Sequence, residues 1–136
     1  MMTLECLCGG ASVVIARLPD FVFECNCALC RKTGARWGYF SPEEVEGRGT
    51  TRVFRRTDKV DPASQIHFCP ECGVAVHFTM TESAIARFGN SMAGVNMALA
   101  DEGDLAGIEL RFPDGRNWSG EGAFGFVRDP RVFGKG

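Results

Sequence analysis

The sequence contains little that would direct it to a membrane or to nucleic acid. It has no run approaching the roughly 18 consecutive apolar residues that a spanning helix requires, although 45% of its 136 residues are hydrophobic. Its 15 lysine and arginine residues are outnumbered by 17 aspartate and glutamate residues, which gives a formal charge of −2. A chain with this charge has no overall attraction to phosphate backbones or anionic lipid. We therefore expect no membrane partner and no nucleic-acid partner.

The first residues also lack a basic segment followed by an apolar one, which is the pattern of a secretory signal peptide. This predicts a cytoplasmic, thiol-reducing location. The length of 136 residues predicts one compact domain. Histidine is scarce, with two residues, whereas there are seven cysteines. An odd number of cysteines in a chain without an export signal argues against a framework of disulfides.

The cysteines fall into three short motifs. These are C-x-C at Cys6 and Cys8, C-x-C-x-x-C at Cys25, Cys27 and Cys30, and C-P-x-C at Cys69 and Cys72. Cysteines this close together on a turn can direct their sulfurs at one soft cation, at about 2.3 Å each, whereas a disulfide between them would be strained. All seven are therefore interpreted as metal ligands, and zinc is a commoner occupant of such sites than iron.

Seven ligands divide naturally into four and three. Four cysteines suit a closed structural zinc site, and three protein ligands with a vacant fourth position are usual for a catalytic zinc. The triplet Cys25, Cys27 and Cys30 could surround one face of a metal, and the other four could form the closed site: Cys6, Cys8, Cys69 and Cys72. A second partition is also compatible with the spacing, in which His67 joins the triplet. We assign no role to His67 or His77, because most histidines are ordinary core or surface residues.

Short apolar runs predict a mostly β domain. The expected strands are Ser12–Arg17, Phe21–Glu24, Arg52–Arg55, Gln65–Phe68, Val74–Phe78, Ala84–Phe88, Gly94–Leu99 and Ile108–Phe112. One short helical turn is expected over residues 41–45, because Ser41 can cap a helix and Pro42 fits its first position.

On these motifs the sequence resembles the glutathione-dependent formaldehyde-activating enzyme family, including its centromere protein V-like branch. The matching segments are Cys6–Gly9, Cys25–Lys32 and Phe68–Gly73, and weaker matches to that branch follow at Val95–Gly103 and Arg111–Trp118. The resemblance predicts a domain over residues 4–120. A C-terminal tail, residues 121–136, matches nothing that we can name.

The resemblance implies a single-domain β-tent fold of antiparallel sheets that carries two zinc ions. It places Cys25, Cys27 and Cys30 on the catalytic zinc and the remaining cysteines on the structural one: Cys6, Cys8, Cys69 and Cys72. It also implies carbon–sulfur lyase activity, the reversible joining of formaldehyde to glutathione as S-(hydroxymethyl)glutathione. The expected partners are thus glutathione or another small thiol and a small aldehyde.

The residues that follow the triplet suit an anionic thiol. Zinc with a vacant position would deprotonate an incoming thiol, which could then attack a small aldehyde. Residues 31–59 contain eight basic residues against four acidic ones, a local charge of +4. Arg31 and Lys32 are our candidates for binding the carboxylates of glutathione. Trp37, Tyr39 and Phe40 could form the wall of a pocket beside the metal.

Two other functions are compatible with the motifs. One is a noncatalytic module in which both metals only stabilise the fold and a basic surface binds a partner. Such a module favours a basic tail or an extended basic patch, whereas this chain is slightly acidic and its eight basic residues are interrupted by Glu43, Glu44 and Glu46. The other is a redox or thiol-trapping site at the triplet, which zinc coordination would protect from modification. We therefore expect a zinc-dependent lyase.

Overall fold

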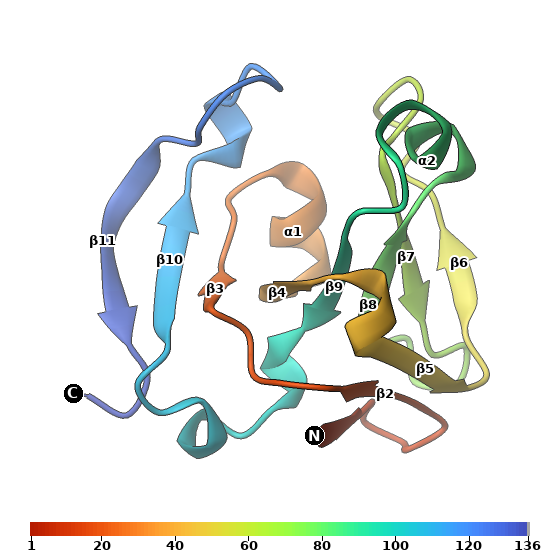
Figure 1. Cartoon of the computed structure of the whole chain (residues 1–136), viewed down its shortest axis with the longest axis vertical. Coiled ribbons are helices and arrows are strands. Elements are labelled where there is room, and N and C mark those ends of the chain that lie inside the picture. Colours follow the sequence, from red (N-terminus) through yellow and green to blue (C-terminus); the bar gives the residue numbers. More distant parts are fainter. Residues whose placement is uncertain (136) are drawn as a thin grey trace.

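Two β-sheets form the framework of residues 1–135, which are the residues that the computed structural model describes (Figure 1). The strands are β1 (Met2–Glu5), β2 (Ala11–Ile15), β3 (Phe21–Phe23), β4 (Trp37–Phe40), β5 (Val45–Gly49), β6 (Arg52–Phe54), β7 (Ser64–Phe68), β8 (Ala75–Met80), β9 (Ala93–Asn96), β10 (Glu109–Pro113) and β11 (Phe126–Val132). The smaller sheet has the order β1-β2-β5, and the larger has the order β11-β10-β3-β4-β9-β8-β7-β6. The pairings are antiparallel, except that β3 and β10 are parallel.

The helices are all short. Those in the described residues are α1 (Ala28–Thr33), α2 (Glu82–Phe88) and the 3₁₀ helices η1 (Pro42–Glu44), η2 (Met97–Leu99), η3 (Glu102–Leu105) and η4 (Gly115–Asn117). In residues 1–135, no helix has both the length and the apolar character needed to cross a membrane. The sequence-based prediction of a mainly β single domain is confirmed.

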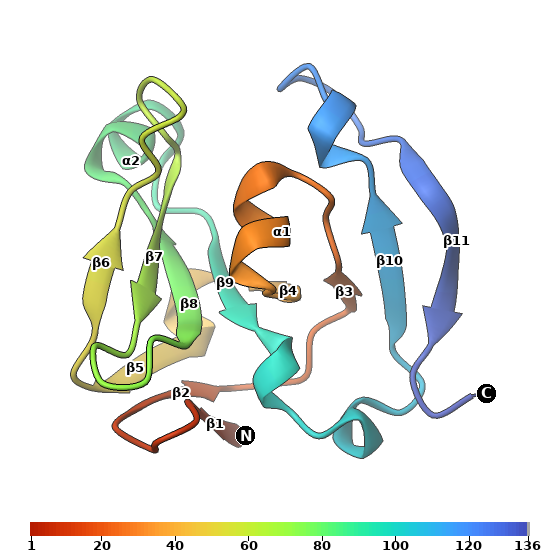
Figure 2. The same cartoon turned by 180° about the vertical axis from the view of Figure 1, so that it is seen from behind.

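The larger sheet curves around α1. Figures 1 and 2 show this helix between β3, β10 and β11 on one side and β6, β7 and β8 on the other. The smaller sheet lies across one end of this arrangement, close to the N-terminus. The curvature therefore places Cys30, which belongs to α1, on the concave side of the sheet.

Two apolar clusters support this arrangement. The larger cluster joins the smaller sheet to the larger one, and its fully buried members include Val13 of β2 and Val95 of β9. The smaller cluster lies against α1, where Leu29 and Cys30 pack on buried residues of the larger sheet. Strand β4 contributes to both clusters because its side chains alternate: Trp37 belongs to the smaller one and Phe40 to the larger one.

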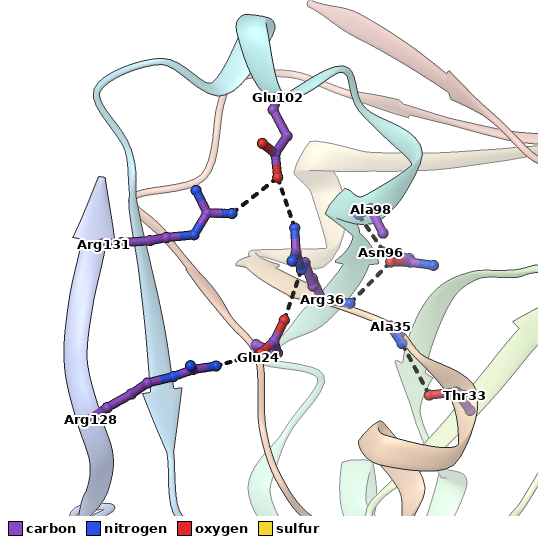
Figure 3. Close-up of polar contacts among 9 residues, drawn as sticks. All are labelled: Glu24, Thr33, Ala35, Arg36, Asn96, Ala98, Glu102, Arg128 and Arg131. Atoms are coloured by element: carbon purple, nitrogen blue, oxygen red, sulfur yellow. Dashed lines mark hydrogen bonds and ion pairs between the residues drawn. The ribbon is translucent and has the colours of Figure 1, made fainter. Parts of the chain in front are cut away.

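Asn96 is a buried polar residue that connects α1 to the sheet. Its side-chain oxygen accepts hydrogen bonds from the backbone N–H groups of Arg36 and Ala98, both at 3.1 Å (Figure 3). Its amide nitrogen donates to the carbonyl oxygen of Ala75 at 2.8 Å. The segment that follows α1 is thereby fixed to β8 and β9, since a buried amide with these partners is costly to displace.

Most of the predicted strands are confirmed within one or two residues at each end. The predicted strand over residues 84–88 is wrong, because this segment forms α2. Thr81 caps that helix by accepting a hydrogen bond from the Ala84 N–H at 3.3 Å, and Gly89 follows its last residue. The predicted strand over residues 94–99 ends at Asn96 and continues as η2. The predicted helical turn is present as η1, with a capping box between Ser41 and Glu44.

Of the predicted tail, residues 121–136, Gly136 lies outside the described residues, and the segment 121–135 contains a strand that the sequence did not predict. Strand β11 pairs with β10, although register shifts interrupt the pairing. Phe133 follows β11 and packs in the larger apolar cluster with 1% of its surface exposed. Most of this segment is otherwise exposed, which explains why it shows no clear apolar pattern.

We predict that Phe133→Ala lowers the free energy of unfolding by about 3–5 kcal/mol, because it removes a fully buried aromatic ring. Phe126→Ala is the matched control, since the Phe126 side chain is 54% exposed. Its expected effect is below about 1 kcal/mol. Urea denaturation followed by circular dichroism measures both values. Equal effects of the two substitutions would contradict a stabilising role for Phe133.

Candidate functional site

The cysteines of the first and third motifs form one cluster. The Sγ atoms of Cys6, Cys8, Cys69 and Cys72 lie within 4.8 Å of one another. The Cys6–Cys8 and Cys8–Cys69 sulfur pairs are 3.7 and 3.6 Å apart. Four thiolates at about 2.3 Å from a tetrahedral zinc would be about 3.8 Å apart. The spacing therefore fits a metal of this size held by four cysteines.

Two tight turns bring these sulfurs together. Gly9 and Gly73 each adopt a positive φ angle, at 79° and 76°, which places glycine where the chain reverses after a cysteine. The backbone N–H groups of Gly10 and Ala11 point at the sulfurs of Cys8 and Cys6, at 3.4 and 3.3 Å. The backbone of Val74, followed by that of Cys8 and by the side chains of Cys6 and Cys69, lowers the pKa of Cys72 to about 6. Such N–H groups favour thiolates, the form that binds metal.

The remaining three cysteines form a second cluster. The sulfurs of Cys25, Cys27 and Cys30 also lie within 4.8 Å of one another, and each residue is partly exposed. Among the described residues, no fourth cysteine, histidine or carboxylate joins this group. The structure thus groups the cysteines as four and three, and both groups are consistent with metal sites.

Helix α1 sets the geometry of this three-cysteine cluster. Cys27 is the N-cap residue, and its sulfur accepts a hydrogen bond from the Cys30 N–H at 3.4 Å. Because Cys30 follows Cys27 by one helical turn, the two side chains lie close together. Gly34, with φ at 71°, ends the helix through a bond from its N–H to the Cys30 carbonyl oxygen at 3.0 Å. The helix was not predicted from the sequence, because it has no buried residue to give an apolar period.

The three thiols differ in acidity. Hydrogen bonds with the side chains of Cys25 and Cys30 lower the pKa of Cys27, whereas hydrogen bonds with the side chains of Cys25 and Cys27 raise the pKa of Cys30. The positive charge of Arg56 also lowers the pKa of Cys27. Arg56 is held by Asp58 through two contacts of 2.7 Å. Its approach to the cluster depends on the position of the β6–β7 hairpin, so spacing along the chain could not reveal it.

A loop after β10 lies directly against the cluster. A Cβ atom added to Gly115 would overlap the sulfur of Cys25, so only glycine fits at this position. Asn26 holds the loop in place: its amide nitrogen donates to Asp114 at 2.8 Å, and its oxygen accepts from the Arg116 N–H at 2.9 Å. The 111–118 segment, singled out by its sequence, therefore covers one side of the three-cysteine cluster.

The basic residues after the triplet divide into two kinds. Arg36 donates to Glu24 and to Glu102, both at 3.1 Å, and Arg128 and Arg131 complete this network (Figure 3). By contrast, Arg31 and Lys32 are exposed on the last turn of α1, and within residues 1–135 neither forms an ion pair. Arg31 borders a cavity of about 370 Å³ together with Cys25 and Cys30.

A second cavity, of about 590 Å³, lies on another side of Cys30. We call it the aromatic cavity, and the aromatic residues that line it are Phe21, Phe23, Trp37, Tyr39, Phe78, Trp118 and Phe124. Trp37 and Tyr39 thus line a pocket as expected, whereas Phe40 packs in the larger apolar cluster. Burial, followed by the charges of the three nearby cysteines, raises the pKa of Tyr39, so its phenol stays protonated at neutral pH.

The two histidines stack on each other. Their rings are parallel, with centroids 4.3 Å apart, and His67 makes a 2.8 Å hydrogen bond with Thr79. His77 is buried, and its Nδ1 atom has no hydrogen-bond partner among the described residues. Neither histidine belongs to a group of metal-binding side chains in residues 1–135. The partition in which His67 completes the triplet is therefore wrong.

The fold and the clusters define a class of protein: a mainly β domain with a four-cysteine and a three-cysteine cluster, each consistent with a metal site. The profile of the glutathione-dependent formaldehyde-activating enzyme family matches residues 1–107. The chain belongs to this family.

Comparison with solved structures agrees with the fold. A Rhodobacter sphaeroides protein, whose crystal structure was determined as a structural-genomics target, matches with a TM-score of 0.59 and 21% sequence identity. The match covers 79% of this chain and 97% of that chain. At this identity, the likeness shows a shared fold. The search of curated proteins gave no match.

We predict that Gly115→Ala disrupts the three-cysteine cluster and leaves the four-cysteine cluster intact, because the new methyl group displaces the sulfur of Cys25. The bound metal should decrease by one ion per chain, as measured by plasma mass spectrometry. Gly103→Ala is the control, since an added Cβ at Gly103 meets no atom within 4 Å. Equal metal content in both variants would show that Gly115 does not constrain the cluster.

We also predict that stability falls as the pH decreases from about 6.5 to about 4. Burial, with the charge of His67, lowers the pKa of His77 from 6.5 to about 4. In this range the unfolded chain binds a proton at His77 that the folded chain does not, so acid favours unfolding. Urea denaturation at several pH values tests this against His77→Gln, whose decline should be shallower. Burial also lowers the pKa of His67, which is present in both proteins, so identical pH profiles would contradict the role of His77.

Proposed function

We propose that this protein is a zinc-dependent carbon–sulfur lyase that acts on the adduct of an aldehyde with glutathione or another small thiol. One observation carries the proposal: the three-cysteine cluster has no fourth side-chain ligand among residues 1–135, and Cys30 borders two cavities. This is the arrangement expected where a substrate sulfur completes the coordination of a metal. The resemblance of residues 95–103 and 111–118 supports placing the chain in the centromere protein V-like branch.

The two clusters would have different roles. Cys25, Cys27 and Cys30 would hold a catalytic zinc, and the other four cysteines a structural one: Cys6, Cys8, Cys69 and Cys72. When bound at the three-cysteine cluster, zinc supplies Lewis acidity that favours the thiolate form of a substrate thiol. The cytoplasm suits this site, because a reducing compartment keeps thiols available for metal and substrate.

The side chains around the cluster have separate tasks. Arg31 and Lys32, which have no ion-pair partner within residues 1–135, would bind the carboxylates of glutathione. Tyr39 lines the same cavity as Cys30, and its protonated phenol would donate a hydrogen bond to the oxygen of the adduct. In breakdown, the carbon–sulfur bond breaks, the electron pair stays on sulfur, and the hydroxyl proton leaves as the carbonyl forms. The reaction needs no oxidant.

We predict that Cys27→Ser lowers the rate of S-(hydroxymethyl)glutathione breakdown at least about 100-fold and removes one of two zinc ions per chain. Serine keeps the helix cap, so the substitution acts mainly on the metal ligand.

In the same assay, Tyr39→Phe should keep both zinc ions and lower kcat about 10- to 100-fold. Formaldehyde release and zinc content are measured on the same samples.

Cys8→Ser provides the comparison for the four-cysteine cluster. It should lower thermal stability, because it opens the site that joins the two sheets.

Unchanged turnover by Cys27→Ser protein with one zinc would contradict the catalytic assignment. A wild-type protein that retains two zinc ions and breaks down no thiol adduct would favour the noncatalytic module.

A further inference from the structure

The two cavities that Cys30 borders differ sharply in character. The smaller one, of about 370 Å³, is lined by the charged side chains of Glu24, Arg31 and Arg128. The aromatic cavity, of about 590 Å³, has no charged residue in its lining within residues 1–135. Among the residues that the structure describes, Cys30 alone belongs to both linings. A molecule whose reacting sulfur lies at the cluster can therefore extend a charged half and an apolar half in different directions.

The walls of the aromatic cavity come from distant parts of the chain. Strands β3, β4 and β8 provide the inner wall, where Phe23 and Tyr39 meet edge to face at 5.4 Å, as do Trp37 and Phe78 at 5.1 Å. The outer wall comes from the segment after η4. There, the ring of Phe124 lies 5.8 Å from that of Phe23.

Other contacts fix these walls in place. Phe78 covers Gly94, its neighbour on β9, and a Cβ atom at Gly94 would overlap the Phe78 ring. Trp118 lies 4.4 Å from Phe124 between ring centroids, and its indole N–H donates to the Gly122 carbonyl oxygen at 3.2 Å. The cavity is therefore a built feature of the fold, supported by a glycine on one side and a closed loop on the other.

Formaldehyde would leave most of this cavity unfilled. Its contribution to a thiol adduct is a single carbon and its oxygen, whereas the cavity has the volume of a typical site for a much larger ligand. The charged thiol half suits the other side of Cys30, because the described lining of the aromatic cavity offers no positive charge to pair with a carboxylate, whereas Arg31 and Arg128 border the smaller cavity. An aromatic ring suits the cavity well, since edge-to-face contacts with the wall add to the gain from burial.

We infer that the aldehyde half of the substrate carries an aromatic ring, which occupies the aromatic cavity while the charged thiol half lies toward Arg31. This inference rests on the proposed function. The chemistry is the same addition and elimination: the thiol sulfur bonds to the carbonyl carbon, the carbonyl π bond breaks, and the thiol proton passes to the oxygen. The cavity selects among aldehydes by the apolar surface that each one buries.

Binding can be tested without turnover by using stable thioethers. S-benzylglutathione and S-methylglutathione share the charged half and differ in the ring, and isothermal titration calorimetry gives the Kd of each. We expect S-benzylglutathione to bind at least about ten-fold more tightly to the wild-type protein. In Phe124→Ala, this preference should fall to about three-fold or less, because the outer wall loses its ring.

Phe88→Ala is the matched control. Phe88 lies on α2, is 62% exposed, and is not in the lining of the aromatic cavity. This variant should keep the preference of the wild-type protein. Equal Kd values for the two thioethers in the wild-type protein would overturn the inference, and so would a preference that Phe124→Ala leaves unchanged.

Turnover then separates this inference from the proposed function. Wild-type protein is assayed with the glutathione adducts of phenylacetaldehyde and of formaldehyde, and we expect a higher kcat/KM for the first. If the protein breaks down the formaldehyde adduct but does not prefer the benzyl thioether, the inference of an aromatic substrate is wrong and the proposed lyase activity stands. If it prefers the benzyl thioether but breaks down neither adduct, the aromatic cavity binds an aromatic ligand and the proposed lyase activity is wrong.

Discussion

The approach of four sulfurs from distant parts of the chain is the constraint on which the fold depends. Cys6 and Cys8 follow the first strand of the smaller sheet, and Cys69 and Cys72 lie between β7 and β8 of the larger one. Four ionised thiols at these distances would repel one another, so the grouping calls for a cation. With a cation bound as proposed, the joint between the sheets would be electrostatic, and it would close a loop of about sixty residues that contains the second cluster.

The second cluster depends on a different principle. A helix of only six residues has little stability of its own, and α1 has no fully buried residue. It is held by its surroundings: the curved sheet encloses it, Asn96 fixes the segment that follows it, and the Asp114–Gly115 loop covers the cysteines that precede it. The cluster thus lies on a short helical turn inside a rigid β framework, with part of its surface left accessible.

The sequence revealed the chemistry of the ligands better than their surroundings. Cysteine spacing predicted both clusters because each motif is local, and a tight turn is enough to bring its sulfurs together. The alternation of apolar residues predicted most strands, but it failed at α2, where one buried residue, Ala84, gives no helical period. The aromatic cavity could not be predicted, because Phe23, Phe78 and Phe124 become neighbours only through strand order and loop closure. Arg56 reaches the cluster in the same way.

The loop that begins at Asp114 has two contacts of very different kinds. One end of it rests on Cys25 through Gly115, and the next turn carries Trp118 and Phe124 to the wall of the aromatic cavity. A ligand in that cavity and a metal at the cysteines would therefore order the same stretch of backbone. Coupling between two binding events is reciprocal, so whatever factor the ligand adds to metal affinity, the metal adds to ligand affinity. With zinc and substrate bound as proposed, the substrate would then help to keep the protein loaded where free zinc is scarce.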